Sequence, residues 1–276
     1  MPELPEVETT LRALRVIGRT IMAARGIDYL PTIAPASPEA LDQALRGRQI
    51  IGAFRRGKYL LFALTDDAIL SVHLRMSGRL LRLPGLPEAD RHTRLILDLD
   101  DATALVLRDP RKFARVRILS QAEFRALDAT LGPEPFDICR DAEAWKARLS
   151  AHGRRGLKAL LMDQRFVAGI GNIYADEALF RARLHPLRRA GTLSKAEMHC
   201  LAASILEVLE EAIAAEGTTL EDGAYRFGEG RAGNFALRLR VYGRAGKPCI
   251  RCGTPVVRIP FGGRSAYYCP SCQQRT

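Results

Sequence analysis

The sequence predicts a multidomain α+β protein with a β domain first, a helical domain next and a small metal module last. Residues 20–119 contain short apolar or alternating runs separated by turn residues, which is typical of a β-sandwich or barrel. Beyond residue 137 the apolar residues recur at helical spacing. Residues 235–276 return to turn-rich sequence and carry four of the six cysteines.

The N-terminal stretch MPELPEVETT predicts a helix start, because an early proline and acidic residues suit the first helical turn. Val7, Leu11, Leu14 and Ile17 recur at helical spacing until Gly18, which is able to end the run. We therefore expect a buried amphipathic helix that holds the N-terminus in place, although chain ends usually fray.

The β domain is predicted from runs of apolar residues between turns. In the run RLILDLD, Leu95, Leu97 and Leu99 alternate with more polar or outward-facing partners, as in a strand with one buried face. The strand candidates are residues 59–64, 68–74, 94–100, 104–108 and 114–120.

The pattern changes at LGPEPFD (131–137), a proline-bearing stretch that fits a hinge. After it, Trp145 and Leu149 at i, i+4 and a long apolar-periodic run from Ser194 predict helices. We set the boundaries at a β domain of residues 1–132, a hinge of 133–145, a helical domain of 146–234 and a metal module of 235–276.

The chain of 276 residues carries 42 Lys and Arg against 31 Asp and Glu, a formal charge of +11. This excess predicts a polyanionic partner, nucleic acid rather than membrane, although a merely basic soluble protein is the simpler alternative. No secretory leader and no membrane-length apolar run stands out, so we expect a cytosolic protein without a membrane partner. Cysteines in that compartment should be thiols or metal ligands rather than disulfides.

The metal module contains the pattern C-x2-C-x16-C-x2-C. Two such pairs supply four thiolates for a closed, structural zinc site, and two redox pairs are the less favoured alternative. The four predicted ligands are Cys249, Cys252, Cys269 and Cys272. The isolated Cys139 and Cys200 are interpreted as buried fillers.

Two further features fit phosphate binding. Gly262-Gly263 predicts a hairpin tip that leaves Arg264 exposed, either simply solvated or as a phosphate clamp. Gly169, Gly171 and Asn172 precede a predicted helix, where backbone N–H groups attract anions. Two glycines before a helix are often just a turn, but nearby Arg154, Arg155 and Lys158 favour contact with a nucleic-acid backbone.

Taken together, the motifs resemble the formamidopyrimidine-DNA glycosylase family (Fpg, also called MutM) along essentially the whole chain. They are PELPEVET, RRGKYL at 55–60, HLRMSG at 73–78, DPRKF at 109–113, LGPEP at 131–135, GIGNIYADE at 169–177, VYGR at 241–244 and the four-cysteine finger. The resemblance implies an N-terminal catalytic β-sandwich flanked by helices, and a C-terminal helix-two-turn-helix DNA-binding domain with a zinc finger. It also implies DNA in the cleft between them.

The implied activity is a bifunctional DNA glycosylase and abasic-site lyase of base excision repair. It removes 8-oxoguanine and formamidopyrimidines through a Schiff base and then cleaves the strand by β,δ-elimination. The nucleophile is the secondary amine that Pro2 presents once Met1 is removed, with Glu3 as the neighbouring acid/base. An α-amine has a reference pKa near 7.7–8.0, against about 10.4 for lysine, so more of it is free base at neutral pH.

The resemblance also assigns the remaining site residues. Lys58 matches the lysine of β-elimination and phosphate contact, and Arg264 matches the finger arginine of δ-elimination. Met76, Arg111 and Phe113 match the wedge that fills the gap left by an extruded base. The other implied DNA contacts are His92, Arg154, Asn172 and, from its place beside the glycine turn, Lys158. Residues 223–235 fall at the family's variable lesion-capping loop.

Three other functions remain open at this point. The endonuclease VIII class removes oxidised pyrimidines by the same chemistry. A non-catalytic zinc-finger DNA-binding protein would use Pro2 and Glu3 only as a helix start. An RNA-binding protein is less favoured, because no array of stacking aromatics is evident. We expect a monomer that binds one zinc ion and double-stranded DNA containing oxidised purines or abasic sites.

Overall fold

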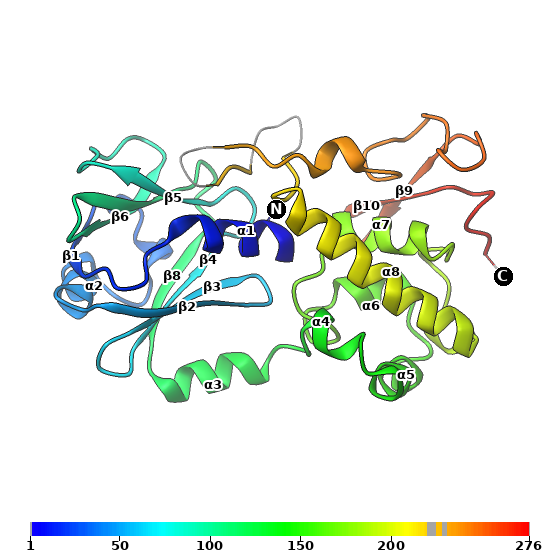
Figure 1. Ribbon diagram of the computed structural model, residues 1–276, viewed down its shortest axis with the longest axis horizontal. Coiled ribbons are helices and arrows are strands. Elements are labelled where there is room, and N and C mark those ends of the chain that lie inside the picture. The colour runs from blue at the N-terminus through cyan, green and yellow to red at the C-terminus, as the bar shows by residue number, and fades with distance from the viewer. Residues whose placement is uncertain (1, 220–224, 228–230, 276) are drawn as a thin grey trace. The chain divides into compact units, whose positions relative to one another are not determined.

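The computed structural model describes residues 2–219, 225–227 and 231–275, and the chain forms two compact units (Figure 1). The first unit comprises residues 1–129 and 215–236, and the second comprises residues 130–214 and 237–276. The described residues of 215–234, which the sequence analysis grouped with the helices, therefore belong to the first unit. The stretch 133–145 contains the helix α4 (Pro135–Ile138) and the start of α5 (Ala142–Ala151).

The first unit contains two four-stranded antiparallel sheets, in the orders β1-β6-β7-β5 and β2-β3-β4-β8. The first sheet consists of β1 (Ile21–Arg25), β6 (Thr93–Leu99), β7 (Thr103–Arg108) and β5 (Arg79–Pro84). The second consists of β2 (Ile50–Arg56), β3 (Tyr59–Leu64), β4 (Ile69–His73) and β8 (Arg115–Leu119). The five predicted strands are confirmed, whereas β1, β2 and β5 were not predicted.

One apolar core joins the inner faces of both sheets and confirms the predicted sandwich. Phe62 of β3 and Leu97 of β6 share this core with Val7 of α1 (Leu4–Leu14). The outer face of β6 is covered as well. Ile96 packs in a second cluster on that face, so the even-numbered positions of β6 point outward as predicted but are buried rather than exposed to solvent.

Further helices flank the sandwich. The helix α3 (Gln121–Ala129) places Phe124 over the outer face of the second sheet. The helix α2 (Pro38–Leu45) packs against β1, and a short 3-10 turn, η1 (Leu30–Thr32), precedes it. They confirm the flanking helices that the resemblance implies, although no sequence pattern indicated the positions of α2 and α3.

The first helix ends earlier than predicted. Arg15 adopts a left-handed conformation (φ 46°) that stops the helix after Leu14. The Arg82 guanidinium donates hydrogen bonds to the carbonyl oxygens of Leu14 and Arg15, at 3.1 and 2.6 Å, and so satisfies the helix end. Ile17 lies beyond this end and is 60% exposed.

The second unit is helical, as predicted, and carries the metal module. Besides α4 and α5 it contains α6 (Leu157–Met162), α7 (Asn172–Arg181), α8 (Lys195–Ala214) and the 3-10 turn η2 (Ala190–Thr192), while η3 (Phe235–Arg238) spans the boundary between the units. Trp145 of α5 is buried and donates its indole N–H to the carbonyl of Met198 on α8, at 3.1 Å. The helix α7 packs against α6, α8 and β10.

The metal module contains the hairpin β9 (Val257–Phe261) and β10 (Arg264–Tyr268). Gly262 and Gly263 form its tip with φ of 50° and 72°, a conformation that favours glycine, so the predicted hairpin is confirmed.

The two isolated cysteines differ. Cys139 is buried as predicted, and burial raises the pKa of its thiol to about 12, so it stays protonated and unreactive. Cys200 is exposed on α8, and its assignment as a buried filler is wrong. Its position in the helix, four residues after the exposed Ala196, puts it on the solvent face.

Among the described residues, no helix combines the length and the apolar character needed to cross a bilayer.

Candidate functional site

The N-terminus is tethered, because α1 begins with a reciprocal capping box. Pro2 and Glu3 are buried, and the backbone N–H of Glu3 donates to the Glu6 carboxylate at 2.8 Å. The other oxygen of Glu6 accepts from the backbone N–H of Thr218, at 2.7 Å. Tyr225 donates its hydroxyl to the Glu6 carbonyl at 3.3 Å. The chain start is therefore fixed to the segment 215–236 of the same unit.

Glu6 is a site residue that the sequence analysis did not single out. The available signal was the spacing of Glu3 and Glu6, three residues apart around a helix start. Gly217 shows how tightly this contact is packed: its φ is 82°, and a Cβ atom there would lie 3.1 Å from the Glu6 carboxylate.

Lys58 lies in the turn between β2 and β3 and is buried. Arg55 stabilises this turn by donating to the carbonyl of Gly57 at 3.0 Å. The same guanidinium forms an ion pair with Glu8 of α1 at 3.1 Å. One arginine thus links the helix that follows Pro2 and Glu3 to the hairpin that carries Lys58.

His73, at the end of β4, lies in cationic surroundings. Burial, together with the charges of Arg75 and Lys58, lowers the pKa of His73 to about 3. Its Nδ1 accepts the backbone N–H of Arg75 at 3.0 Å, and its ring meets Tyr59 edge to face with centroids 4.6 Å apart. The imidazole is therefore neutral at physiological pH.

The residues that match the wedge lie on two turns of the first unit. Met76 follows β4 and is 38% exposed, while Phe113 precedes β8 and is 43% exposed. The Arg111 guanidinium lies 5.0 Å from the centroid of the Phe113 ring. His92 is half-buried, and its carbonyl accepts the backbone N–H of Asp109 at 2.8 Å. All four candidates therefore belong to the first unit.

In the second unit, Asn172 is the first residue of α7. Gln164 shapes the glycine turn before it, accepting from the backbone N–H of Gly169 at 2.9 Å and donating to the carbonyl of Ile170 at 2.8 Å. The Asn172 side-chain oxygen is buried and has no hydrogen-bond partner within the described part of the chain. Arg154 is exposed in the turn after α5.

Lys158 does not lie where a DNA contact requires it. Its side chain is 0% exposed, and its ammonium contacts both carboxylate oxygens of Asp176 at 2.7 and 2.8 Å. It also donates to the carbonyl of Ser265 at 2.8 Å. Because burying a charge requires pairing, this lysine forms a structural ion pair, and its assignment as a DNA contact is corrected accordingly.

The partner of Lys158 also holds the hairpin that carries Arg264. Asp176 accepts the backbone N–H of Tyr267 at 3.0 Å, so its ion pair contacts β10 at two positions. Burial raises the pKa of Asp176 to about 7, although Lys158 acts in the opposite direction. Arg264 itself is exposed beside the hairpin tip, as predicted.

A second buried acid on α7 holds the start of the metal module. Glu177 accepts backbone N–H groups of Arg240, Val241 and Tyr242, all at 2.9–3.1 Å, and burial raises the pKa of its carboxyl. Arg251 closes the other end of α7 by donating to the carbonyls of Phe180 and Arg181, at 2.9 and 3.1 Å. Neither role was predicted from the sequence.

The four predicted ligands meet at one point. Their sulfur atoms all lie within 4.8 Å of one another, and the Cys252 sulfur is 3.5 Å from those of both Cys269 and Cys272. Four thiolates at about 2.3 Å from a tetrahedral zinc would be about 3.8 Å apart, so the donor set fits zinc. With all four positions taken by sulfur, such an ion folds the module and leaves no site for a substrate.

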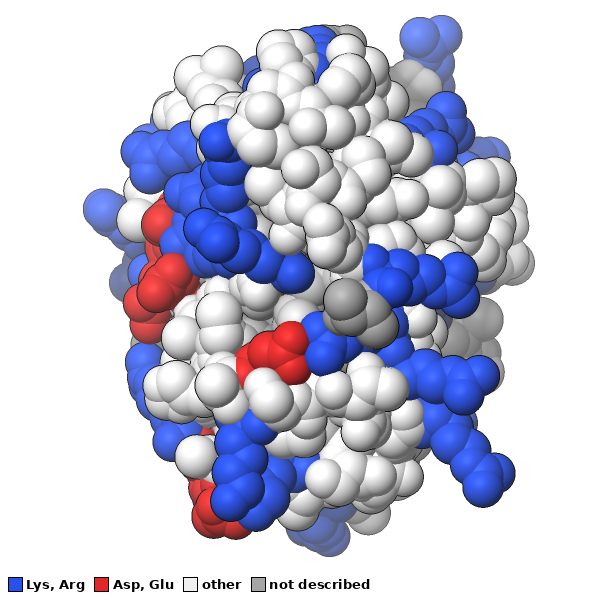
Figure 2. Space-filling model, turned by 90° about the vertical axis from the view of Figure 1, so that its right-hand side faces the viewer, with Lys and Arg blue, Asp and Glu red and all other residues white. Residues whose placement is uncertain are grey.

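One face of the molecule is rich in basic side chains. Figure 2 shows one face of the molecule on which Lys and Arg side chains greatly outnumber the acidic ones. This agrees with the formal charge of +11 and with a polyanionic partner.

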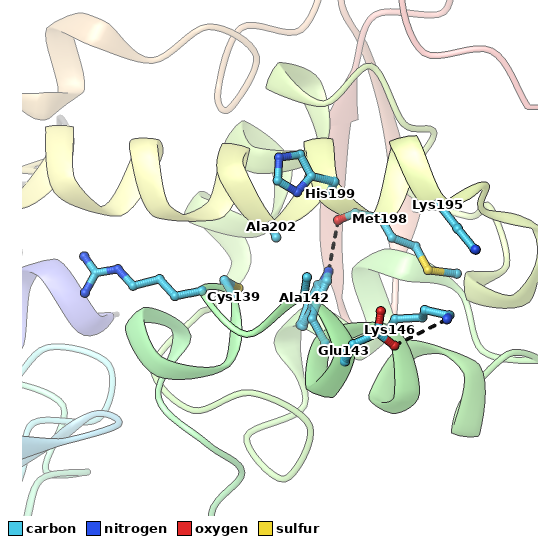
Figure 3. Close-up of a pocket in the computed structure, with 10 residues that line it drawn as sticks. Cys139, Ala142, Glu143, Lys146, Lys195, Met198, His199 and Ala202 are labelled. Carbon is cyan, nitrogen blue, oxygen red and sulfur yellow. Dashed lines mark hydrogen bonds and ion pairs between the residues drawn. The ribbon is translucent and has the colours of Figure 1, made fainter.

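The second unit also has a small pocket of about 140 Å³ between α5 and α8 (Figure 3). Cys139, Trp145 and Met198 line it together with charged side chains, among them Glu143 and Lys146. None of the predicted catalytic or DNA-contact residues lines this pocket, so it is not part of the candidate site.

The fold and these features define a class of protein: a β-sandwich with a tethered N-terminal proline, joined in one chain to a helical unit with a zinc finger. Three family models match the chain. They are the formamidopyrimidine-DNA glycosylase N-terminal domain at residues 1–116, the H2TH domain of the same family at 131–223, and the zinc finger found in FPG and IleRS at 246–275.

Curated relatives named formamidopyrimidine-DNA glycosylase match along the full length. The one from Herpetosiphon aurantiacus is 42% identical over 99% of this chain and 100% of its own, and the one from Heliobacterium modesticaldum is 47% identical with the same coverage. This chain belongs to the formamidopyrimidine-DNA glycosylase family.

Solved structures of proteins from this family are similar to this chain in fold. The MutM (Fpg) protein from Thermus thermophilus is 41% identical, with a TM-score of 0.85 and 100% coverage of both chains. The Lactococcus lactis Fpg in complex with DNA containing Fapy-dG is 34% identical, with a TM-score of 0.87, covering 99% of this chain and 100% of that one.

Proposed function

We propose that this chain is a bifunctional DNA glycosylase and abasic-site lyase. It removes oxidised purines, 8-oxoguanine and formamidopyrimidines, from double-stranded DNA in base excision repair. The observation that carries the proposal is the buried Pro2-Glu3 start of α1, held in place by Glu6. Chain ends are usually free to fray, whereas the contact of Glu6 with Thr218 fixes this one to a segment 212 residues away.

The chemistry begins once Met1 is removed and Pro2 presents a secondary amine. Its nitrogen attacks the sugar C1′, the damaged base leaves with the bonding electron pair, and the nitrogen gives up its proton. The C1′–O4′ bond then breaks, with its electron pair going to O4′, which takes up a proton, and the opened sugar is left as a cationic iminium. This iminium withdraws electrons from C2′, so that a proton is lost there and the 3′ phosphate leaves by β-elimination. Loss of the 5′ phosphate by δ-elimination follows.

Glu3 is suited to the proton transfers at the sugar, because it follows Pro2 directly and its position is fixed by the capping box. Lys58 is assigned to β-elimination and phosphate contact, and the Glu8–Arg55 pair links its hairpin to α1. Arg264 is assigned to δ-elimination from the tip of the zinc-finger hairpin.

The remaining residues bind and deform the DNA. Asn172 and Arg154 of the second unit are assigned to phosphates, and His92 of the first unit to the DNA backbone. Met76, Arg111 and Phe113 fill the gap left by the extruded nucleotide, since base chemistry cannot occur within the stack. Exposed Met and Phe side chains on turns support this role, because large apolar residues are usually buried.

The proposed setting is the cytoplasm of a bacterial-type cell, at the nucleoid, with the protein acting as a monomer. Part of the predicted lesion-capping loop, at residues 223–224 and 228–230, lies outside the described residues. The preferred lesion is therefore to be determined by the excision assays described below.

The test uses the full-length protein in three forms: processed, Met1-retained and Glu3→Gln. Each is incubated with 8-oxoguanine duplex and with abasic duplex in the presence of borohydride, which traps the iminium as a covalent adduct. We expect the processed protein to give an adduct with both duplexes. The Met1-retained form should lose excision by about four orders of magnitude or more, because its Pro2 nitrogen is an amide.

Glu3→Gln provides the matched control, since its amine is intact. It should still form an adduct with abasic duplex while failing to excise 8-oxoguanine. Normal excision by a Met1-retained protein, verified by intact mass, would assign the nucleophile to another residue, with Lys58 first. Faster excision of thymine glycol than of 8-oxoguanine would instead favour the oxidised-pyrimidine activity.

A further inference from the structure

One buried carboxylate organises both turns that carry the wedge residues. Asp109 is 0% exposed and lies between β7 and β8. One of its oxygens accepts the Ser77 hydroxyl at 2.5 Å and the backbone N–H of Arg111 at 3.1 Å. The other accepts the backbone N–H groups of Phe113 and Ala114, at 2.6 and 2.7 Å. Four donors thus converge on a single side chain.

These donors belong to the two exposed turns. Ser77 is the neighbour of Met76, and the other three donors are Phe113 itself and two residues close to it, Arg111 and Ala114. Each turn also contains a non-glycine residue with positive φ, Arg75 at 54° and Lys112 at 60°. Such conformations persist only where surrounding contacts over-determine them. The hydrogen bonds to Asp109 are contacts of this kind, so removing them should free both turns.

The backbone of Asp109 joins a third segment to the same point. Its N–H donates to the carbonyl of His92 at 2.8 Å, and its carbonyl accepts the Arg94 guanidinium at 2.9 Å. Arg94 is 1% exposed and paired with Asp28 at 2.6 Å. The segments that Asp109 contacts therefore carry the wedge residues Met76, Arg111 and Phe113 as well as His92.

We infer that Asp109 is a positioning residue for base extrusion, an inference that rests on the proposed function. It is buried and reaches no DNA; it acts by holding Met76 and Phe113 in one arrangement before DNA binds. A wedge that is already ordered enters the base stack without the entropy loss of ordering two turns. The chemistry at Pro2 does not need this carboxylate.

The test variant is Asp109→Asn, which keeps the size of the side chain and one acceptor oxygen but turns the other oxygen into an NH₂ donor that faces other donors. Single-turnover rates are measured on duplex with 8-oxoguanine opposite cytosine, which requires extrusion, and on abasic duplex, where no base has to leave the stack. We expect excision to slow by about tenfold or more and abasic cleavage by less than about threefold. A 2-aminopurine placed beside the lesion reports unstacking by its fluorescence. The rate of this fluorescence change should fall in parallel with the rate of excision.

Two further variants keep the inference falsifiable. Ser77→Ala removes only the link to the Met76 turn and leaves the other three donors, so it should slow excision by a smaller factor than Asp109→Asn. Asp42→Asn is the matched control: Asp42 accepts the backbone N–H of Ala24 at 2.7 Å in the same unit but contacts neither turn. It should change neither substrate's rate. Thermal unfolding of each variant shows whether it is folded.

Equal losses on both substrates by a folded Asp109→Asn protein would overturn the inference, and so would unchanged excision. If Asp109→Asn does not fold, Ser77→Ala decides, and it must slow excision more than abasic cleavage. If the unsubstituted, processed protein fails to excise 8-oxoguanine, the proposed function fails before this question arises.

Discussion

The two units hold their exposed functional candidates in different ways. In the first, Met76 and Phe113 stand on turns that neutral O–H and N–H groups attach to the carboxylate of Asp109, next to an apolar sandwich core. In the second, Arg264 stands on a hairpin held by the Lys158–Asp176 ion pair and by four cysteine sulfurs.

This difference has an energetic consequence. The sandwich buries apolar side chains from both sheets and α1, enough for an independent core. The finger shares a small cluster with α7, in which Phe180, Val241 and Val256 pack beside three of the four ligand cysteines. We therefore expect the first unit to depend on hydrophobic burial, and the finger to depend on its metal and on buried charge.

Zinc removal should have the largest effect, and it should affect the second unit while leaving the first unit folded. In small finger modules structural zinc contributes about 10–16 kcal/mol of apparent binding free energy, which is folding free energy. A chelated protein should lose its ordered finger and bind abasic duplex at least about 100-fold more weakly, while the sandwich remains folded. Fluorescence anisotropy with labelled duplex and limited proteolysis measure these two outcomes.

Zinc added back in excess of the chelator is the control and should restore binding. Unchanged affinity in a sample shown to be metal-free would contradict the structural role of the ion. Loss of the sandwich at the same chelator concentration would contradict the separation of the units.

Breaking the buried ion pair should have the next largest effect. Lys158→Met leaves the carboxylate of Asp176 buried without its partner charge, and such a change costs about 3–5 kcal/mol. The double variant Lys158→Met/Asp176→Leu should recover most of that loss, because it leaves no unpaired charge. Urea unfolding of the second unit, followed by the fluorescence of Trp145, measures both.

Lys146→Met is the matched control, since Lys146 and Glu143 form an exposed pair at 3.4 Å. Exposed pairs contribute about 0–1 kcal/mol, so this variant should unfold almost as the unsubstituted protein does. A similarly small effect for Lys158→Met would show that the buried pair is not what fixes the hairpin.

The features that the sequence predicts well are those with a local pattern. The alternation at Leu95, Leu97 and Leu99 predicts a strand, and the glycines at 262 and 263 predict a hairpin, because both depend on neighbours in the chain. The cysteine spacing likewise predicts four ligands that the fold brings together. The site roles themselves come from whole-chain resemblance and remain proposals.

The features that the sequence does not predict depend on contacts between distant segments. From the sequence, Lys158 is predicted to be a surface cation beside a glycine turn. Only the fold brings Asp176 and Ser265 to its ammonium. The carbonyls at the end of α1 are satisfied by Arg82, which is far from Leu14 in the sequence. Asp109 belongs to a quoted motif, yet its role requires Ser77 from another turn.

Acid should weaken the first unit through His73. Its pKa is about 3 in the folded protein and 6.5 in the unfolded chain, so between these values the unfolded chain binds the proton more readily. The contribution of His73 to the free energy of unfolding is therefore fully present above about pH 6.5. Below that pH it falls by about 1.4 kcal/mol for each pH unit, which amounts to about 2 kcal/mol by pH 5.

The measurement is urea unfolding of the unsubstituted protein and His73→Gln between pH 8 and 5. Glutamine does not titrate but offers an acceptor for the backbone N–H of Arg75. The difference between the two curves should be flat above pH 6.5 and then slope with the stated sign. A difference that stays constant down to pH 5 would show that His73 is protonated in the folded state.

The smallest expected effect should distinguish residues that bind the DNA phosphates from residues that fill the gap in the base stack. Affinity for abasic duplex should fall with salt, because each cation that neutralises a phosphate contributes about −0.9 to the log–log slope. Arg264→Ala should therefore flatten the slope by about 0.9, since its guanidinium is exposed at the hairpin tip. Met76→Ala should leave the slope unchanged, because a thioether releases no counterion, and should slow base extrusion instead.

Anisotropy titrations of both variants over a range of salt concentrations, with the unsubstituted protein alongside, measure these slopes. Equal flattening by both substitutions would mean that the wedge turns also set the phosphate contacts. No flattening by Arg264→Ala would place Arg264 away from the DNA backbone, and the contrast between the units would then rest on the zinc and the buried ion pair alone.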